Sequence, residues 1–422
     1  MLTIAYLANQ FPSPVEPYVA EEILELRRRG VTVISCSARQ ARNGLSSWIQ
    51  QTLYLQPLRP ALALRALWLC CSQTDKLQDF LNRILLEGRE SPWRRIKALL
   101  HTWLGAYLAL LLQDHDVEHI HVHHGYFSAW IAMVAARLLG ISYSMTLHGS
   151  DLLLRHAYLD LKLPNCSACF TVSEYNLNYL RQHYPCVDDR KLVLRRLGVD
   201  VTSPALLQLP PLRERFTLLS VGRLHRVKDH EFLIRGCAAL CSRGMNLLCL
   251  IAGDGPERKR LAHQVSQLGL GNEIKLLGHV PRGELASLYS QAHLLVLTSR
   301  SEGIPVVLME AMARGTLVLA PNITGIPELV ADGRTGFLYQ PGSLEDFIAS
   351  VELIRNSLDS LDGVRRVARQ HVMRNFHRQT NLHAFTDAFL LRACRHPDEA
   401  SATEGSRGQT HGAGLRSAIR QP

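Results

Sequence analysis

The chain has 422 residues and a mass of 47.3 kDa, a length that predicts two domains. Hydrophobic residues make up 47% of it and charged residues 20%, which excludes wholesale disorder and favours a large buried core. The formal net charge is +10, from 47 Lys and Arg against 37 Asp and Glu. An anionic partner is therefore expected, whether nucleic acid, a lipid surface or a phosphorylated small molecule.

Residues 1–7 run directly into polar positions, without the basic start, long apolar stretch and small-residue cleavage site of a secretory signal. We therefore expect the protein in the cytoplasm. The most apolar helical stretch, about residues 98–112, is shorter than the roughly 20 residues that a bilayer span needs. No transmembrane helix is predicted.

Strand-like apolar runs alternate with helix-length segments, which is typical of parallel sheets covered by helices. In the first half the expected strands are 3–7, 31–36, 119–122, 142–147 and 169–172. In the second half they are 217–221, 247–252, 274–277, 294–298 and 316–320. The pattern predicts an α/β protein with two doubly wound, Rossmann-like domains.

The domains are expected over residues 1–200 and 213–375, with a cleft between them. Residues 201–212 are rich in Pro and lack periodicity, which predicts a linker. Residues 376–395 are expected to form a helix that packs back on the first domain. The last segment, 396–422, has little apolar content and predicts a disordered tail.

A basic segment follows the first expected strand of the second half. Gly222 ends this strand, and Arg223 and Lys228 come next. Ligands bind at the carboxyl ends of strands in doubly wound domains, and Arg and Lys there suit a diphosphate. Taken alone, the segment would more simply be interpreted as a solvated basic loop.

Two carboxylates flank a helix start after the fourth strand of the second half. Glu302 lies in the loop, Pro305 is suited to open a helix, and Glu310 lies about two turns further on. The backbone N–H groups of Gly303 and Ile304 would face an anion at the positive helix end. Carboxylates accept paired hydrogen bonds from vicinal hydroxyls, so this pair suits a sugar nucleotide. Without the other motifs, two surface glutamates would be the simpler interpretation.

Residues 301–313 resemble the SEGxPxxxxEAMA motif of the retaining GT-B glycosyltransferases of glycosyltransferase family 4. The similarity extends in order through Gly222-Arg223 with Lys228, then 253–256, 278–281, 325–329 and 332–336. It is weaker in the first half, at Phe11-Pro12 with Glu16, Glu22-Ile23 and residues 147–151. These first-half pieces resemble the branch that builds exopolysaccharides and colanic-acid-like polymers.

The resemblance implies a GT-B fold and a retaining sugar transfer, by front-side displacement, from a nucleotide-diphosphate sugar to a saccharide or lipid-linked glycan in surface-polysaccharide synthesis. It implies no metal and no other cofactor. Carried over by position, the resemblance implies that Arg223 and Lys228, beside Gly222, bind the donor diphosphate and that Glu310 binds the ribose. It implies that Glu302 and the backbone of Gly303 and Ile304 bind the donor sugar. His148 would lie near the reacting sugar.

Two segments depart from the family pattern. Residues 15–18 read Val-Glu-Pro-Tyr where the branch has Ser-Glu-Thr-Phe, and Pro17 removes an N–H and stiffens a loop near the acceptor site. Thr324-Gly325 replaces paired glycines, so the loop near the donor phosphates is expected to have fewer free conformations.

Three other patterns suggest metals. Residues 114–116 form a DxD, a manganese signature of another glycosyltransferase fold, but they precede a strand of the first domain. His119, His121 and His123 alternate along one strand face, so a zinc site is conceivable, although we expect a satisfied cluster at the cleft edge. The CxxC at 166–169 has no second pair and apolar neighbours, and the 10 cysteines of the chain are expected to be reduced core residues or free thiols.

Basic residues cluster at 27–29, where an early helix ends, and at 94–97, before the apolar stretch. They form either a solvated face or an attachment to an anionic inner membrane leaflet beside a lipid-linked acceptor. Nucleic-acid binding is not expected, because no recognised module is present. Two alternatives to a transferase stay open: a GT-B sugar-nucleotide epimerase, and an inactive donor-binding scaffold of a polysaccharide assembly complex.

Overall fold

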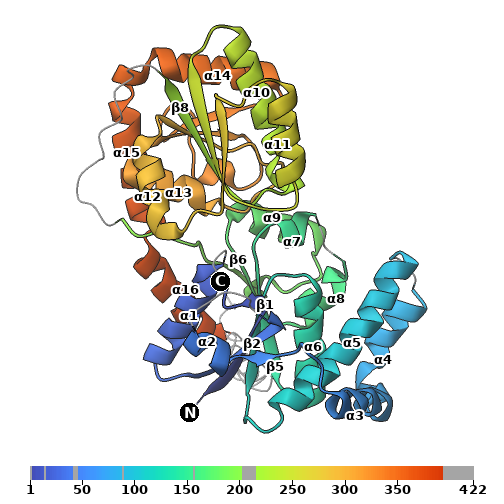
Figure 1. Ribbon diagram of the computed structural model, residues 1–422. Helices are drawn as coiled ribbons and strands as arrows, with labels where there is room; N and C mark the ends of the chain where they lie inside the picture. Colours follow the sequence, from blue (N-terminus) through green and yellow to red (C-terminus); the bar gives the residue numbers. More distant parts are fainter. Residues whose placement is uncertain are drawn as a thin grey trace, which may run out of the picture.

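The computed structural model describes residues 2–13, 16–40, 46–87, 90–154, 157–201 and 215–392. Two lobes, each built on one sheet, are stacked end to end (Figure 1). The strand order is β3-β2-β1-β4-β5-β6-β7 in the first sheet and β10-β9-β8-β11-β12-β13 in the second. The expected linker, apart from residue 201, and the expected tail lie outside the described residues.

Every strand pair in the described sheets is parallel. The first sheet comprises β1 (Thr3–Phe11), β2 (Thr32–Gln40), β3 (Leu53–Tyr54), β4 (His119–His123), β5 (Ser142–Leu147), β6 (Ala168–Thr171) and β7 (Leu192–Leu194). The second comprises β8 (Phe216–Val221), β9 (Leu247–Ala252), β10 (Ile274–Gly278), β11 (Leu294–Val296), β12 (Leu317–Pro321) and β13 (Phe337–Tyr339). The expected α/β class with two parallel, Rossmann-like sheets is confirmed.

Helices cover both faces of each sheet, which explains why most strands are continuous apolar runs. Those of the first lobe are α1 (Pro17–Arg28), α2 (Ser46–Gln51), α3 (Pro60–Ser72), α4 (Thr74–Leu85), α5 (Pro92–Leu112), α6 (Phe127–Leu139), α7 (Ser150–Leu153), α8 (Leu159–Asn165) and α9 (Glu174–His183). Those of the second sheet are α10 (His230–Ser242), α11 (Arg258–Gln267), α12 (Arg282–Gln291), α13 (Val306–Arg314), α14 (Leu344–Asn356) and α15 (Asp362–Asn375), followed by α16 (Arg378–Arg392).

Helix α5 is longer than the apolar stretch that the sequence analysis identified. It begins at Pro92, so it spans 21 residues, and by length and composition alone it could cross a membrane. It packs against α6, and 44% of its most apolar window is buried. Gly105 permits the close approach, because a Cβ there would lie 2.6 Å from Cβ of Val134.

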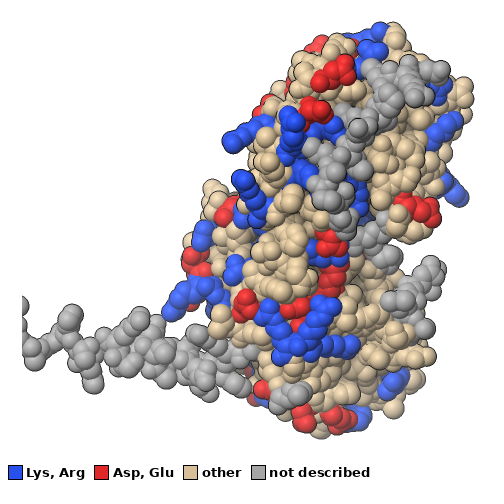
Figure 2. Space-filling view, turned by 90° about the vertical axis from the view of Figure 1, so that its left-hand side faces the viewer, with Lys and Arg blue, Asp and Glu red and all other residues tan. Residues whose placement is uncertain are grey.

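Basic side chains are spread over both lobes on the face that Figure 2 presents, and acidic side chains lie among them. The basic cluster at 27–29 makes contacts within the first lobe. Arg27 donates to the carbonyl of Val33, and Arg28 and Arg29 both pair with Glu25. The Arg28 side chain nevertheless stays 66% exposed, so the cluster combines internal contacts at the end of α1 with a solvated charge.

The last helix, α16, lies against α1 of the first lobe (Figure 1). Phe385 and Phe389 are buried there against Phe170 of β6. Arg378 at its start pairs with Glu21 at 2.7 Å. We propose the domain limits 1–200 and 213–375, which the two separate sheets support. The contacts of α16 support a helix at 376–395 that packs back on the first domain, of which residues 393–395 lie outside the described residues.

The docking of α16 can be tested with Phe389→Ala. Removing this fully buried ring is expected to lower the free energy of unfolding by about 3–5 kcal/mol, because the first lobe loses apolar burial and gains a cavity. Urea unfolding measures the change. Leu391→Ala, on the same helix but exposed, is the control and should change stability by less than about 0.5 kcal/mol. Equal effects of the two substitutions would contradict this placement of α16.

Candidate functional site

The carboxyl ends of both sheets meet at the junction of the lobes, where a cavity of about 580 Å³ lies. Gly222, Arg223 and Glu310 line it from the second lobe. Tyr18 and Arg196 are among the residues that line it from the first lobe. Three of the residues predicted from the sequence thus face one cavity between the domains.

The turn after β8 lies against the turn after β9. Gly253, at φ +153°, leaves room for this contact, because a Cβ there would lie 1.9 Å from the carbonyl oxygen of Gly222. Only glycine adopts this conformation without strain and fits this space. The close packing places Arg223 at the cavity wall.

Lys228 and Glu302 form an ion pair, with Nζ and Oε1 2.5 Å apart. Both side chains are largely buried. The carbonyl of Lys228 accepts a hydrogen bond of 3.0 Å from the hydroxyl of Thr298. The family resemblance implies that Lys228 contacts the diphosphate and Glu302 the sugar, and the two side chains lie within reach of each other.

Thr324 holds the loop that carries Glu302. Its hydroxyl donates to the carbonyl of Glu302 at 2.7 Å, and its φ of +44° lies in the left-handed region. A threonine in this region is strained, and the hydrogen bond helps to compensate. The loop at 324–325 was expected to have fewer free conformations. The structure adds a hydrogen bond from Thr324 to Glu302, a predicted site residue, and no sequence pattern indicated this contact.

The two lobes touch where two glycines meet. A Cβ on Gly303 would lie 2.1 Å from the carbonyl oxygen of His148, and a Cβ on Gly149 would lie 2.8 Å from the nitrogen of Gly303. Gly149 has a φ of +127°, which a side chain would strain further. The loops that carry His148 and Glu302 are thus in backbone contact across the cleft.

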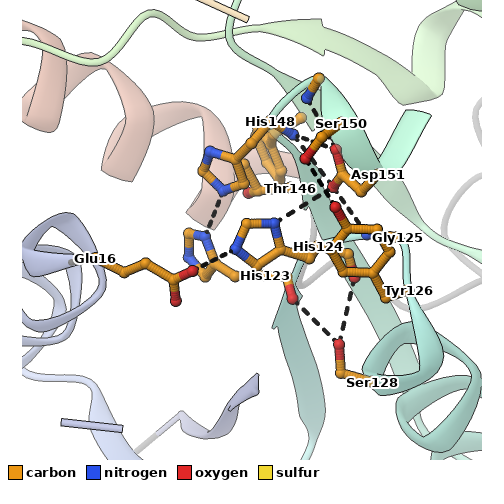
Figure 3. A network of polar contacts seen from close by, with 12 residues as sticks. Glu16, His123, His124, Gly125, Tyr126, Ser128, Thr146, His148, Ser150 and Asp151 are labelled. Carbon is orange, nitrogen blue, oxygen red and sulfur yellow. Dashed lines mark hydrogen bonds and ion pairs between the residues drawn. The ribbon is translucent and has the colours of Figure 1, made fainter. Parts of the chain in front are cut away.

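His148 belongs to a chain of buried polar groups (Figure 3). Its Nε2 lies 3.0 Å from Nδ1 of His123, and Nε2 of His123 lies 2.9 Å from a carboxylate oxygen of Glu22. The hydroxyl of Tyr6 also donates to Glu22. Burial and the positive charge of His124 hold the pKa of His148 well below its usual range, so its imidazole is neutral.

His124 is the positive centre of this network (Figure 3). It lies 2.8 Å from a carboxylate oxygen of Glu16 and 3.6 Å from one of Asp151. Burial opposes its protonation, but the two carboxylates outweigh burial and raise the pKa of His124 to about 10. Asp151 in turn accepts backbone N–H groups of Gly125, His148 and Gly149. The ion pair therefore fixes the loop in which His148 lies, and no sequence pattern indicated this pairing.

The remaining histidines of β4 do not lie at the cleft edge, so that expectation was wrong for them. His119 lies between the hydroxyls of Ser142 and Ser144, and both His119 and His121 contact Phe389 of α16. They sit inside the first lobe because α16 covers this strand face. Glu22, His121 and His123 could in principle hold a metal ion, since their ligand atoms lie within 4.8 Å of one another.

The other metal patterns are remote from the cleft. Residues 114–116 are exposed and precede β4, so they lie at the amino end of the sheet. Cys166 and Cys169 are buried in the core, where burial raises the pKa of Cys166 to about 12. All nine cysteines of the described residues are free. Pro17 does not stiffen a loop but opens α1, at a position where a helix needs no N–H donor.

Glu328 joins the lobes at a second point. Its carboxylate accepts the backbone N–H groups of Glu174 and Tyr175 at the start of α9, at 2.9 and 2.8 Å. A negative charge at a helix N-terminus is stabilising. Glu328 also pairs at 3.2 Å with Arg196, a residue of the cavity wall. The family-like motif at 325–329 includes Glu328, but no sequence pattern indicated these contacts or Arg196.

The His124 ion pair predicts a pH-dependent stability. The folded pKa of about 10 exceeds the usual 6.5, so the stabilisation is complete below about pH 6.5 and is lost as pH rises towards 10. His124→Gln should cost about 3–5 kcal/mol near pH 6.5, because Asp151 stays buried without its cation. The difference from the parent in urea unfolding should shrink by pH 10. A difference independent of pH would contradict an imidazolium here.

Two family models match the chain. Residues 15–203 match the model described as Glycosyltransferase Family 4, and residues 208–370 match Glycosyl transferases group 1. The first match covers β2 to β7 of the first sheet, the second covers the whole second sheet, and together they cover most of the described residues.

Relatives and solved structures agree with these matches. One relative is WcaL of Salmonella typhimurium, a putative colanic acid biosynthesis glycosyltransferase, which is 32% identical over 196 residues. The match covers 45% of this chain and 48% of that protein, so it spans about half the length of this relative. WcaL of Escherichia coli K12 is 25% identical over 412 residues, covering 90% of this chain and 97% of that protein. The crystal structure of Anabaena HepE with UDP and glucose shares the fold, with a TM-score of 0.67 at 18% identity, covering 92% of this chain and 99% of that one. The chain belongs to the family 4 glycosyltransferases of the GT-B fold.

Proposed function

We propose that this glycosyltransferase transfers a sugar from a nucleotide-diphosphate sugar to a saccharide or lipid-linked glycan, with retention of configuration, in surface-polysaccharide synthesis in the cytoplasm. The cavity where Arg223 and Glu310 meet between the lobes is the observation that carries the proposal. The complex of HepE with UDP and glucose and the colanic acid relatives support the same donor and product classes.

Glu310 and Arg223 would hold opposite ends of the nucleotide moiety. Glu310, at the cavity wall on α13, accepts a hydrogen bond of 2.9 Å from the hydroxyl of Tyr289, which orients its carboxylate. A carboxylate so held suits paired ribose hydroxyls. Arg223 provides a fork of N–H donors for the diphosphate.

Lys228 and Glu302 would change partners when the donor binds. A diphosphate carries more negative charge than one carboxylate and competes for Lys228, which frees Glu302 for the donor sugar. Gly303 and Ile304 precede α13, so their backbone faces charge at a positive helix end. Fixed positive charges here stabilise the leaving diphosphate most as the bond to the sugar breaks.

In the proposed reaction the acceptor oxygen attacks C1 of the donor sugar on the face that the diphosphate leaves. The bond from C1 to the diphosphate oxygen breaks, and the acceptor proton passes to that departing diphosphate. The products are a glycoside and a nucleoside diphosphate, so atoms and charge balance without a metal. His148, neutral and held by His123, would make a hydrogen bond to the sugar.

The purified protein incubated with a panel of UDP- and GDP-sugars tests this function. A transferase releases nucleotide and forms a new glycoside only when an acceptor is present. A sugar-nucleotide epimerase would convert its donor without an acceptor, and an inactive scaffold would show a thermal shift with nucleotide but no turnover.

The roles of the two glutamates can be separated. Glu310→Ala should weaken UDP or GDP binding about 10- to 100-fold, because a charged hydrogen-bond acceptor for ribose is lost. Glu302→Gln should lower kcat about tenfold or more, because charge on the sugar develops in the transition state. Its nucleotide affinity should equal or exceed that of the parent, since Lys228 no longer has a competing carboxylate.

Calorimetric nucleotide binding and saturating turnover are measured side by side for both variants. Glu345→Gln, an exposed glutamate on α14, is the matched control and should alter neither quantity. Loss of nucleotide affinity in Glu302→Gln, with affinity kept in Glu310→Ala, would show that the two roles are reversed.

Metal independence is tested by chelation. Turnover should survive EDTA, because in the proposed site Arg223, Lys228 and the start of α13 would meet the diphosphate charge. Activity that disappears with EDTA and returns with one divalent ion would refute this and direct attention to Glu22, His121 and His123.

A further inference from the structure

A second cavity, of about 830 Å³, lies on the first lobe beside the donor cavity. Arg223 lines both cavities, so they adjoin at the residue proposed to hold the diphosphate. The rest of its wall comes from the first lobe, including the end of β2 and one face of α5. The position next to the leaving group is where an acceptor must lie.

Several cations line this cavity, and one of them, Lys162, is held by the carbonyls of Gly125, Tyr126 and Ala157. Arg39, Arg94, Lys97 and Arg223 make no ion pair with any carboxylate in the described parts of the chain. Arg95 differs, since it donates to carbonyls at the end of α4. Lys97 lies over the ring of Trp93, 5.4 Å from its centroid, which leaves its charge without a carboxylate. Cations that form no ion pair and converge on one cavity favour an anionic ligand, and phosphate in particular.

Among the described residues of the cavity wall, Glu16 is the one carboxylate, and of these four cations its charge interacts with Arg223. Glu16 pairs with the imidazolium of His124 at 2.8 Å. The wall also contains Phe127 and Trp130, and His101 stacks on Phe127 with ring centroids 5.1 Å apart. Aromatic walls beside unpaired cations suit a phosphorylated saccharide.

Helix α5 presents a basic face and an apolar face side by side. Arg94, Lys97 and His101 are spaced by three and four residues and face the cavity. A second set lies one residue earlier along the helix and comprises Trp93, Ile96 and Leu100. One residue is a rotation of about 100° in an α-helix, so this second face is turned by about 100° from the basic face. All three are exposed, Trp93 to 66%.

Helix α3 extends the apolar face. It is held to α5 by the indole of Trp103, which donates to the carbonyl of Ala63 at 3.0 Å. Leu64, Leu67 and Trp68 on α3 are exposed, Trp68 to 70%. Neither α3 nor α5 contains Asp or Glu, whereas acidic and basic side chains are mixed on the face in Figure 2. Exposed Trp and Leu beside unopposed cations are typical of a surface that meets anionic lipid.

From this arrangement we infer that the second cavity binds an amphiphilic acceptor, a phosphorylated saccharide with an apolar tail presented from a bilayer. Its phosphate lies on Arg94 and Lys97, and its tail lies over the exposed face of α3 and α5. The inference rests on the proposed function and selects the lipid-linked class among its acceptors.

Three small probes separate the two parts of such a ligand. Octyl phosphate carries tail and phosphate, glycerol phosphate carries only the phosphate, and octyl glucoside carries only a tail and a sugar. Calorimetry with the full chain is expected to show that octyl phosphate binds at least about tenfold more tightly than either of the others, because it makes both contacts.

Two variants locate the contacts. Arg94→Ala with Lys97→Ala should weaken octyl phosphate binding about tenfold or more, and Trp93→Ser with Ile96→Ser should weaken it similarly. Arg366→Ala and Leu353→Ser, exposed positions on α15 and α14, are the matched controls. All these side chains are exposed, so folding should survive, and UDP or GDP affinity should match the parent in every variant.

The outcomes distinguish this inference from the proposed function. Glycerol phosphate binding as tightly as octyl phosphate would overturn the lipid part and indicate a free phosphorylated acceptor. Octyl glucoside binding as tightly would overturn the phosphate part. Nucleotide binding without any octyl phosphate binding would overturn the inference alone, whereas a parent that binds no nucleotide would overturn the proposed function.

Discussion

The parallel direction of every strand in both sheets is the constraint on which the site depends. Because the carboxyl ends of parallel strands share one edge, the loops after β1, β4 and β5 and those after β8, β9 and β11 are all delivered to the junction of the lobes. The glycines at 149 and 303 then let two of these loops touch. A side chain at either position would separate His148 from Glu302, so the geometry of the cleft follows from strand direction and two missing Cβ atoms.

Charge is arranged in fixed layers around this junction. A buried imidazolium, His124, is held by Glu16 and Asp151 and keeps the neighbouring His148 neutral. Further out, Lys228 is held by Glu302, while Arg223 forms no ion pair with a carboxylate of the described residues. The inner charges are satisfied within the protein and give rigidity, and the outer ones are available to an anionic donor.

Much of the fold and of the candidate site could be predicted where the pattern lies within one short stretch of sequence. Apolar runs located the long strands and the spacing of Glu302 and Glu310 located α13, but β3, β7 and β13 have two or three residues each and leave no periodic signal. The start of α5 was missed because Arg94, Arg95 and Lys97 interrupt its apolar pattern.

Contacts between distant parts of the chain could not be predicted. The alternation of residues correctly placed His119 and His121 on one strand face, yet it could not show that α16, over 250 residues later in the chain, covers that face. The pairing of Lys228 with Glu302 and the hydrogen bond from Thr324 likewise depend on tertiary contacts between distant loops.

A crystal structure of the protein with UDP or GDP tests the central claim most directly, because it locates the diphosphate itself. The account predicts that the phosphates lie between Arg223 and the backbone at Gly303, with the ribose hydroxyls on Glu310 and Lys228 turned from Glu302 towards the phosphates. A nucleotide bound away from the cavity between the lobes, or one whose diphosphate contacts neither Arg223 nor Lys228, would contradict it.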